Sequence, residues 1–367
     1  MNIRLIIVIY FLLIPTSLFA WIADLGEPYP VFTPDGKKII YTFDGSHGYF
    51  ETYSVLINSV YENGYAWRNL TRHEYGSSDE WYRKLADLTL SSDGKTISYV
   101  MEFHDSYSEL FVADVNGFDE YVLESGESII SSPAFSPDGS KVVYMSTGGG
   151  NTSLCIKDIN GMNKYVLAEA IDAGLAFAED GERIIFGAER KDRVGIFEIN
   201  PDGTGEKLLS ELTANPVKIV MSPDGEKLAV VAVSDYGDSD IYVLNVDGTG
   251  LTELVGEGTD DFDPVFTPDG EKVVYVSAAR YEIDDYEDLP PDKLYIVNID
   301  GSGAKRITDN EHGELHPAIS PDGTKICYLG YNICWSTECA RKEHELHIMN
   351  LDGSEERVIV PFGFQEI

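Results

Sequence analysis

The most regular feature of this chain is a short apolar segment, a tight turn and a second apolar segment of alternating character. In the copy that reads PVFTPDGEKVVYVS from Pro264 to Ser277, the turn contains Pro268, Asp269 and Gly270. Proline presets the first turn position, aspartate bonds to nearby backbone, and glycine accepts a positive φ. β-branched and aromatic residues follow the turn, as a half-buried strand prefers. The pattern predicts a β-hairpin.

This hairpin recurs seven times, at separations of 42 to 58 residues. The turns are TPDG at Thr33, SSDG at Ser91, SPDG at Ser136, AEDG at Ala178, SPDG at Ser222, TPDG at Thr267 and SPDG at Ser320. A strand with a second turn follows, as in IYVLNVDGTG from Ile241, and a short apolar strand ends the unit. Each unit supplies four antiparallel strands, and repeats of this length and content indicate propeller blades.

We therefore predict an all-β fold, a seven-bladed β-propeller of four-stranded antiparallel blades. A single sheet of this size would leave both faces exposed, so neighbouring blades must pack around an axis. The propeller is expected to be one domain over residues 21–367, with blades near residues 29–75, 85–127, 130–170, 173–212, 216–258, 262–310 and 315–362.

The two faces of such a ring differ in their chemistry. The short, regular turns share one face, whereas the second-to-third strand loops and the connections between blades share the other. These loops vary in length and content, as functional loops on a rigid scaffold do. Their carboxylates would attract cations or basic peptides, and their aromatic side chains would anchor an interface. The candidate contact residues are Tyr75, Asp79, Trp81, Tyr82, Asp261, Phe262, Asp263, Tyr281, Tyr286, Glu314 and His316.

The charge balance narrows the range of partners. With 27 basic and 63 acidic residues, the net charge is −36. A chain this acidic repels nucleic acid phosphates and anionic membrane surfaces. We expect a protein or peptide partner, with basic chemistry as the complementary choice, and a monomeric propeller.

The first twenty residues have the pattern of a secretory signal. Arg4 is followed by an apolar core from Leu5 to Ile14, and the segment ends at Ala20. Residues 1–20 are expected to direct export to the periplasm or the extracellular space. The alternative is an uncleaved anchor from Leu5 to about Ala23, which is just long enough to span a membrane. A cleaved signal would leave no stable membrane insertion.

Four cysteines allow a disulfide and buried thiols. Cys334 and Cys339 lie in one long loop and could close a small disulfide in an oxidising compartment. The same pair could instead bind a metal together with His344 and His347. Cys155 and Cys327 lie in predicted strands and are expected to be buried thiols.

Motifs for catalysis are sparse. The sequence has no G-x-S-x-G nucleophile turn and no glycine-rich phosphate loop between a strand and a helix. Histidines near blade seven are the one constellation of interest, because two pairs could converge on a metal. The candidate ligands are His312, His316, His344 and His347.

Two resemblances bear on these expectations. PAFSPDGSKVVYMS from Pro133 and LYIVNIDGSGAKRIT from Leu294 closely resemble the TolB-type propeller repeat, over about Tyr29 to Val360. TolB itself carries an α/β domain before a six-bladed propeller, so we expect a relative consisting of the propeller only. HPAISPDG from His316 is similar to a segment of oligogalacturonate lyases, which are seven-bladed and hold manganese with histidines. Those lyases use polyanionic substrates and generally act inside the cell, which fits neither the charge of this chain nor its signal.

The sequence thus favours an exported, non-catalytic binding or scaffold propeller without a cofactor. It would recognise a protein or peptide through its acidic, aromatic loop face. The alternatives are a metal-dependent propeller enzyme resembling oligogalacturonate lyase, with the histidine cluster holding the metal, and a structural surface component.

Overall fold

The protein is described by a computed structural model. It describes residues 30–46, 53–63, 68–75, 83–103, 107–116, 119–171, 174–191, 193–234, 237–255, 258–279, 291–332 and 343–360. Within these ranges, 28 strands form seven antiparallel sheets of four strands each. The predicted all-β, seven-bladed propeller is confirmed.

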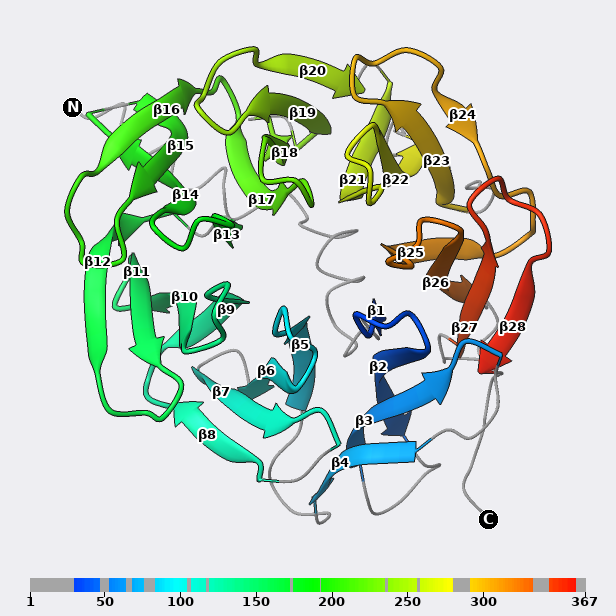
Figure 1. Ribbon diagram of the computed structural model, residues 1–367, viewed down its shortest axis with the longest axis horizontal. Helices are drawn as coiled ribbons and strands as arrows, with labels where there is room; N and C mark the ends of the chain where they lie inside the picture. Colours follow the sequence, from blue (N-terminus) through cyan, green and yellow to red (C-terminus); the bar gives the residue numbers. More distant parts are fainter. Residues whose placement is uncertain are drawn as a thin grey trace, which may run out of the picture.

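Each blade uses four strands that are consecutive in the sequence. Blades 1 to 4 comprise β1 (Val31–Phe32), β2 (Lys38–Ser46), β3 (Tyr53–Tyr61), β4 (Arg68–Tyr75), β5 (Arg83–Leu90), β6 (Thr96–Phe103), β7 (Tyr107–Asp114), β8 (Tyr121–Glu124), β9 (Ile129–Phe135), β10 (Lys141–Gly148), β11 (Asn151–Asp158), β12 (Lys164–Ala170), β13 (Leu175–Phe177), β14 (Ile184–Arg190), β15 (Arg193–Ile199) and β16 (Lys207–Glu211). Blades 5 to 7 comprise β17 (Asn215–Met221), β18 (Lys227–Val233), β19 (Ser239–Asn245), β20 (Thr252–Val255), β21 (Thr259–Phe266), β22 (Lys272–Ala279), β23 (Lys293–Asn298), β24 (Lys305–Arg306), β25 (Gly313–Ile319), β26 (Lys325–Asn332), β27 (Glu343–Asn350) and β28 (Arg357–Val360). The first strand of each blade faces the centre of the ring and the fourth forms its rim (Figure 1).

The turn between the first two strands has the same backbone hydrogen bond in all seven blades. In blade 6, the amide of Gly270 donates to the carbonyl of Thr267 at 2.8 Å, and Gly270 has a φ of 70°. The carboxylate of Asp269 accepts the hydroxyl of Thr267 at 2.5 Å and the amide of Glu271 at 3.0 Å. Blade 4 has alanine at the first turn position and therefore lacks the hydroxyl contact. The turn sequence thus determines a self-contained hairpin.

The hydrophobic core is divided among the interfaces between blades. Seven buried clusters are found in the described residues, and each joins two neighbouring blades. The cluster that closes the ring packs Ile39 and Tyr41 of blade 1 against Leu346 and Ile348 of blade 7. The guanidinium of Arg357 also donates to the carbonyl of Glu62 at 2.6 Å across this junction. In the described strands, closure therefore rests on packing between blades and not on a shared sheet.

Candidate functional site

The inner strands carry a backbone feature that recurs from blade to blade. Asp87, Ser132, Asp263 and His316 each stand four residues before the first turn residue of their blade, and all have a φ of 51° or 52°. The pairing register of β5, β9, β21 and β25 shifts at this point. Such a conformation costs a non-glycine residue about 1–3 kcal/mol unless its surroundings compensate. The compensation comes from the adjacent blade.

These residues are linked across blades by hydrogen bonds and ion pairs. Asp87 Oδ2 accepts the amide of Ser132 at 2.9 Å, and Asp263 Oδ2 accepts the amide of His316 at 3.3 Å. Lys218, the equivalent residue of blade 5, donates from Nζ to Asp263 Oδ1 at 2.6 Å. Asp263 therefore joins blades 5, 6 and 7.

The charges in this network favour an ionised Asp263. Its carboxylate lies 2.7 Å from His316 Nδ1, and both side chains are about nine-tenths buried. Burial raises the pKa of Asp263, but Lys218 and His316 outweigh it and hold the pKa well below the usual range. The ionised carboxylate of Asp263 thus links three blades through its contacts with Lys218 and His316.

Three further predicted contact residues have roles inside the protein. Asp261 is 1% exposed and accepts the hydroxyl of Thr259. Phe262 is partly buried and packs against the clusters on both sides of blade 6. Glu314 is fully buried and accepts the amide of Leu294 at 2.8 Å. Asp261 and Glu314 therefore do not form an exposed acidic rim, because their carboxylates lie beneath the surface.

A second polar cluster lies where blade 7 meets blade 6. His312 Nε2 and His347 Nε2 are 3.4 Å apart, and His347 Nδ1 is 3.2 Å from Glu356 Oε1. Desolvation and the neighbouring His347 lower the pKa of His312. The bond from His347 lowers the pKa of Glu356 to about 2, so this carboxylate is ionised at neutral pH. Of the predicted metal ligands, the structure brings together His312 and His347.

The other candidate ligand, His316, is engaged elsewhere. It pairs with Asp263 on an inner strand and lies apart from His312, His347 and Glu356, which in the described part of the chain form the one group of side chains that could hold a metal ion. The register shift in β25 directs His316 toward blade 6 along the inner ring.

Several predicted residues lie outside the described part of the chain. Among them are Asp79, Trp81, Tyr82, Tyr281, Tyr286, Cys334 and Cys339, together with the segment Met1–Ala20. Tyr75 and His344 are placed by backbone only, in β4 and β27. Cys155 and Cys327 are buried free thiols at 2% and 0% exposure, as expected.

Sequence reasoning did not identify Glu356 or Lys218. Lys218 could have been found, because it stands four residues before its turn, as Asp263 and His316 do. Glu356 follows a turn in a stretch with two other acidic residues, and no spacing rule distinguishes it.

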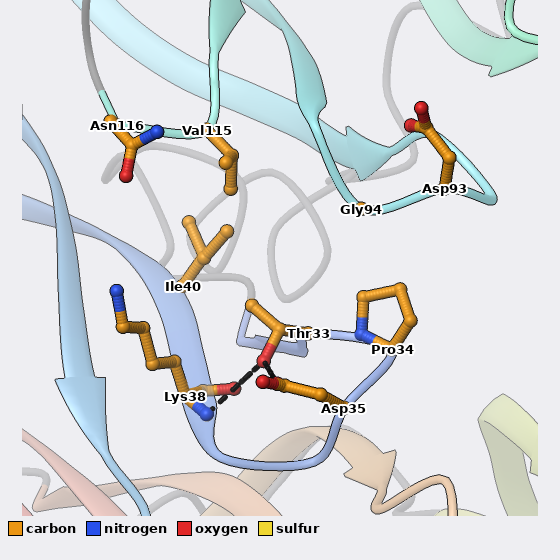
Figure 2. A pocket seen from close by; sticks show the side chains of 9 residues that line it. All are labelled: Thr33, Pro34, Asp35, Lys38, Ile40, Asp93, Gly94, Val115 and Asn116. Carbon is orange, nitrogen blue, oxygen red and sulfur yellow. Dashed lines mark hydrogen bonds between the residues drawn. The ribbon is translucent and has the colours of Figure 1, made fainter.

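A cavity of about 320 Å³ lies between blades 1 and 2 on the turn face (Figure 2). Its lining includes Ile40 and Val115, and Thr33 and Asp35 are hydrogen-bonded to each other beside it. The hydrogen bond from Thr33 lowers the pKa of Asp35, so this carboxylate is ionised, and it already accepts hydrogen bonds within its own turn. The cavity is a gap between turns and offers no converging set of catalytic groups.

In the described ranges there is no helix long and apolar enough to cross a membrane.

Comparison with known proteins identifies related sequences. A family model described as the TolB beta propeller domain matches residues 85–216 and 207–358. The chain is 27% identical over 168 residues to the Tol-Pal system protein TolB of Histophilus somni strain 129Pt. That alignment covers 42% of this chain and 38% of the relative, so it spans well under two thirds of the relative's length.

Solved structures share the fold at low identity. The propeller domain of the Trilobed protease from Pyrococcus furiosus, described as having an open velcro topology, gives a TM-score of 0.61 at 16% identity and covers 92% of this chain and 100% of that chain. Oligogalacturonate lyase from Vibrio parahaemolyticus gives 0.58 at 17% identity, covering 83% and 87%. A putative TolB from Agrobacterium tumefaciens gives 0.52 at 19% identity, covering 70% and 91%. At these identities the likeness is one of fold alone.

Proposed function

The chain belongs to the TolB beta-propeller domain family, and from this premise we propose that it is an exported, non-catalytic propeller that binds a protein or peptide. The proposed partner is basic, in keeping with the net charge of −36. The binding surface is the face that carries the second-to-third strand loops and the connections between blades.

The observation that carries this proposal is the internal use of polar groups on the opposite face. The aspartate of each first-to-second strand turn accepts a backbone amide two residues on, at about 3 Å. The third-to-fourth strand turns repeat this chemistry, as in Asp300, whose carboxylate accepts the amide and the hydroxyl of Ser302 at 2.9 and 2.6 Å. Polar groups that are already hydrogen-bonded within their own turns contribute little to the recognition of a partner, so the loop face is the better candidate for the binding surface.

In this proposal the loops contact the partner, and the polar residues of the inner strands hold the blades in position. Asp263 and His316 hold blades 5 to 7 in register, and Asp261 and Glu314 are buried beneath the surface. Contact with the partner then falls to Tyr75 and to the two predicted aromatic segments, namely Asp79, Trp81 and Tyr82 and the insertion with Tyr281 and Tyr286. Aromatic anchors of this kind contribute most of the binding energy in protein interfaces.

The proposal does not extend to a metal-dependent lyase. The histidines named as candidate ligands are divided, because His316 pairs with Asp263 and not with His312 and His347. An acidic protein also offers little attraction to a polyanionic substrate.

The test uses a display library of short random peptides selected against the immobilised full chain. We expect the enriched peptides to be basic and to contain aromatic residues. Their affinity should fall as salt rises, because exposed charges are screened within about 8 Å at physiological ionic strength. Trp81→Ala and Tyr281→Ala should each weaken the binding of a selected peptide by about tenfold or more.

Tyr165→Ala is the matched control. Tyr165 lies on the outer strand β12 and is 58% exposed, so its removal should leave the affinity unchanged. Enrichment of acidic peptides, or equal losses from Tyr165→Ala and Tyr281→Ala, would contradict the proposed face. Export is tested separately, by determining the N-terminal residue of the protein recovered from outside the cytoplasm; Trp21 is expected.

A further inference from the structure

The cluster between blades 6 and 7 combines two imidazoles with carboxylates on both sides. His347 is on β27 and 5% exposed, and His312 precedes β25 and is 15% exposed. One nitrogen of His347, Nδ1, is 3.2 Å from Glu356 Oε1, and the other, Nε2, is 3.2 Å from Glu345 Oε2. His312 Nε2 is 3.4 Å from His347 Nε2 and 3.9 Å from Glu356 Oε1.

The separations fit ligands of a single ion. Zinc binds nitrogen and oxygen ligands at about 2.0–2.1 Å, so ligand atoms on one ion stand roughly 3.0 to 4.2 Å apart. One ligand atom from each of His312, His347 and Glu356 lies within 4.8 Å of the other two, and His312 Nε2 is 3.4 Å from His347 Nε2 and 3.9 Å from Glu356 Oε1. His347 faces Glu356 with Nδ1 and His312 with Nε2, and only one of these nitrogens can bind a given ion. When Nδ1 binds the ion together with Glu356, the carboxylate of Glu345 faces Nε2, an arrangement that orients metal-bound imidazoles.

The surrounding residues hold these groups in position. Tyr328 donates its hydroxyl to Glu356 Oε1 at 2.6 Å, and Asn310 donates its side-chain amide to the same oxygen at 3.1 Å. Lys293 donates to the carbonyl of His312 at 2.6 Å, which anchors the backbone of that ligand. Lys293 is itself 3.6 Å from the buried Glu314, so its charge is compensated. Groups from the connection between blades, from β23 and from β26 thus support the cluster.

Gly330 packs directly against the two imidazole rings. A Cβ on Gly330 would lie 2.7 Å from His347 Nε2 and 3.0 Å from His312 Cδ2. Because the φ of Gly330 is not in the left-handed region, glycine is required there by space and not by backbone conformation. A larger residue at this position would displace the two imidazoles.

We propose that His312, His347 and Glu356 bind one divalent transition-metal ion, with Glu345 orienting His347. Two imidazoles and a carboxylate favour zinc and its neighbours in the first transition row over calcium or magnesium, which prefer all-oxygen sites. The ion would join the connection after blade 6 to the third and fourth strands of blade 7. Its role is structural.

The experiment measures zinc retained by the purified full chain. The protein is stripped with a chelator, incubated with excess zinc chloride in a large excess of magnesium, desalted, and analysed by elemental mass spectrometry. The excess magnesium occupies sites made only of surface carboxylates and so keeps zinc from binding to them. We expect about one zinc per chain for the wild type. Cobalt in place of zinc should give the intense visible absorption of a four- or five-coordinate site with nitrogen ligands.

Variants locate the ion. His312→Gln and Glu356→Gln should lower zinc retention about tenfold or more, and Glu345→Gln should weaken zinc affinity by about 10- to 100-fold, as loss of an orienting carboxylate does. His316→Gln is the matched control, because it makes the same change in the same blade outside the cluster. Equal retention by His312→Gln and the wild type would overturn the proposal. The proposal would also be overturned if the wild type retained no zinc and gave no cobalt absorption band. This result does not depend on the folding of any variant, and it would mean that the two imidazoles are only a hydrogen-bonded pair.

Discussion

Replacing Asp263 with asparagine tests whether the inner ring of polar residues holds the blades together. Asparagine keeps the shape of the side chain but removes the charge that Lys218 and His316 share. In the native protein, Asp263 Oδ1 is 2.6 Å from Lys218 Nζ and Oδ2 is 2.7 Å from His316 Nδ1. The substitution therefore removes one charge from a contact that spans three blades.

The expected loss can be worked out from the burial of the partners. Breaking a buried ion pair by removing one member costs about 3–5 kcal/mol. Asp263 and His316 side chains are 11% and 9% exposed, whereas Lys218 is 40% exposed and can turn its charge toward water. We therefore expect the lower end, about 3 kcal/mol. With an unfolding entropy of about 2.1 cal/mol/K per residue over 367 residues, the melting temperature should fall by about 4 °C.

The loss of stability caused by Asp263→Asn should become smaller at low pH. Because the pKa of Asp263 is lower in the folded protein than in the unfolded chain, its stabilisation is complete above the unfolded pKa of about 4. It is lost as pH falls toward the folded pKa. The difference between wild type and Asp263→Asn should shrink as the pH falls below about 4.

Urea unfolding, followed by circular dichroism at several pH values, measures this difference. Asp309→Asn is the control, because Asp309 is 98% exposed and its loss should change stability by less than about 0.5 kcal/mol. A double-mutant cycle with Lys218→Met should give a coupling of about 1 kcal/mol or more. Equal effects of Asp263→Asn and Asp309→Asn, or a difference that grows as the pH falls below about 4, would refute the reasoning.

Three other predictions concern packing and turns. Gly174→Ala should destabilise the protein by about 3 kcal/mol or more, because its Cβ would lie 2.3 Å from the backbone nitrogen of Ile219 in the next blade. Gly126→Ala is the matched control, since its Cβ would meet nothing within 4 Å, and similar urea midpoints for the two variants would contradict the predicted clash. Cys327 has a thiol pKa raised by complete burial and should react with iodoacetamide only after unfolding. Peptide mapping measures the labelling, and a labelled Cys327 in the native protein would contradict this prediction. Asp269→Ala removes an acceptor for a hydroxyl and an amide in its turn and should cost about 1 kcal/mol in the free energy of unfolding; an unchanged urea midpoint would argue against the turn as a source of stability.

Much of the fold could be read from the sequence because its signals are local. The turn around Asp269 satisfies its own polar groups within six residues, so the same letters produce the same hairpin wherever they occur. The spacing of the turns then determined the number of blades. Burial of Cys155 and Cys327 followed as well, since each lies in the apolar part of a predicted strand.

The candidate sites were only partly predictable. Asp263 and His316 were expected as contact residues on the loop side of the channel, but they bind each other across 53 residues of sequence. His312 and His347 were expected to meet, whereas the contribution of Glu356 was missed. Neither outcome could be derived from spacing, because both depend on the register shift in β25 and on the packing of blade 7 against blade 6.

The amino-acid sequence by itself therefore determined the blade, its turns and the sevenfold repetition, because hydrogen bonds between residues close in the chain depend on residue type alone. Tertiary structure decided which polar side chains are buried, which pair across blades and which two histidines share a site. Those contacts join residues 9 to 53 positions apart, and their distances depend on bulges and inter-blade packing that no short segment encodes.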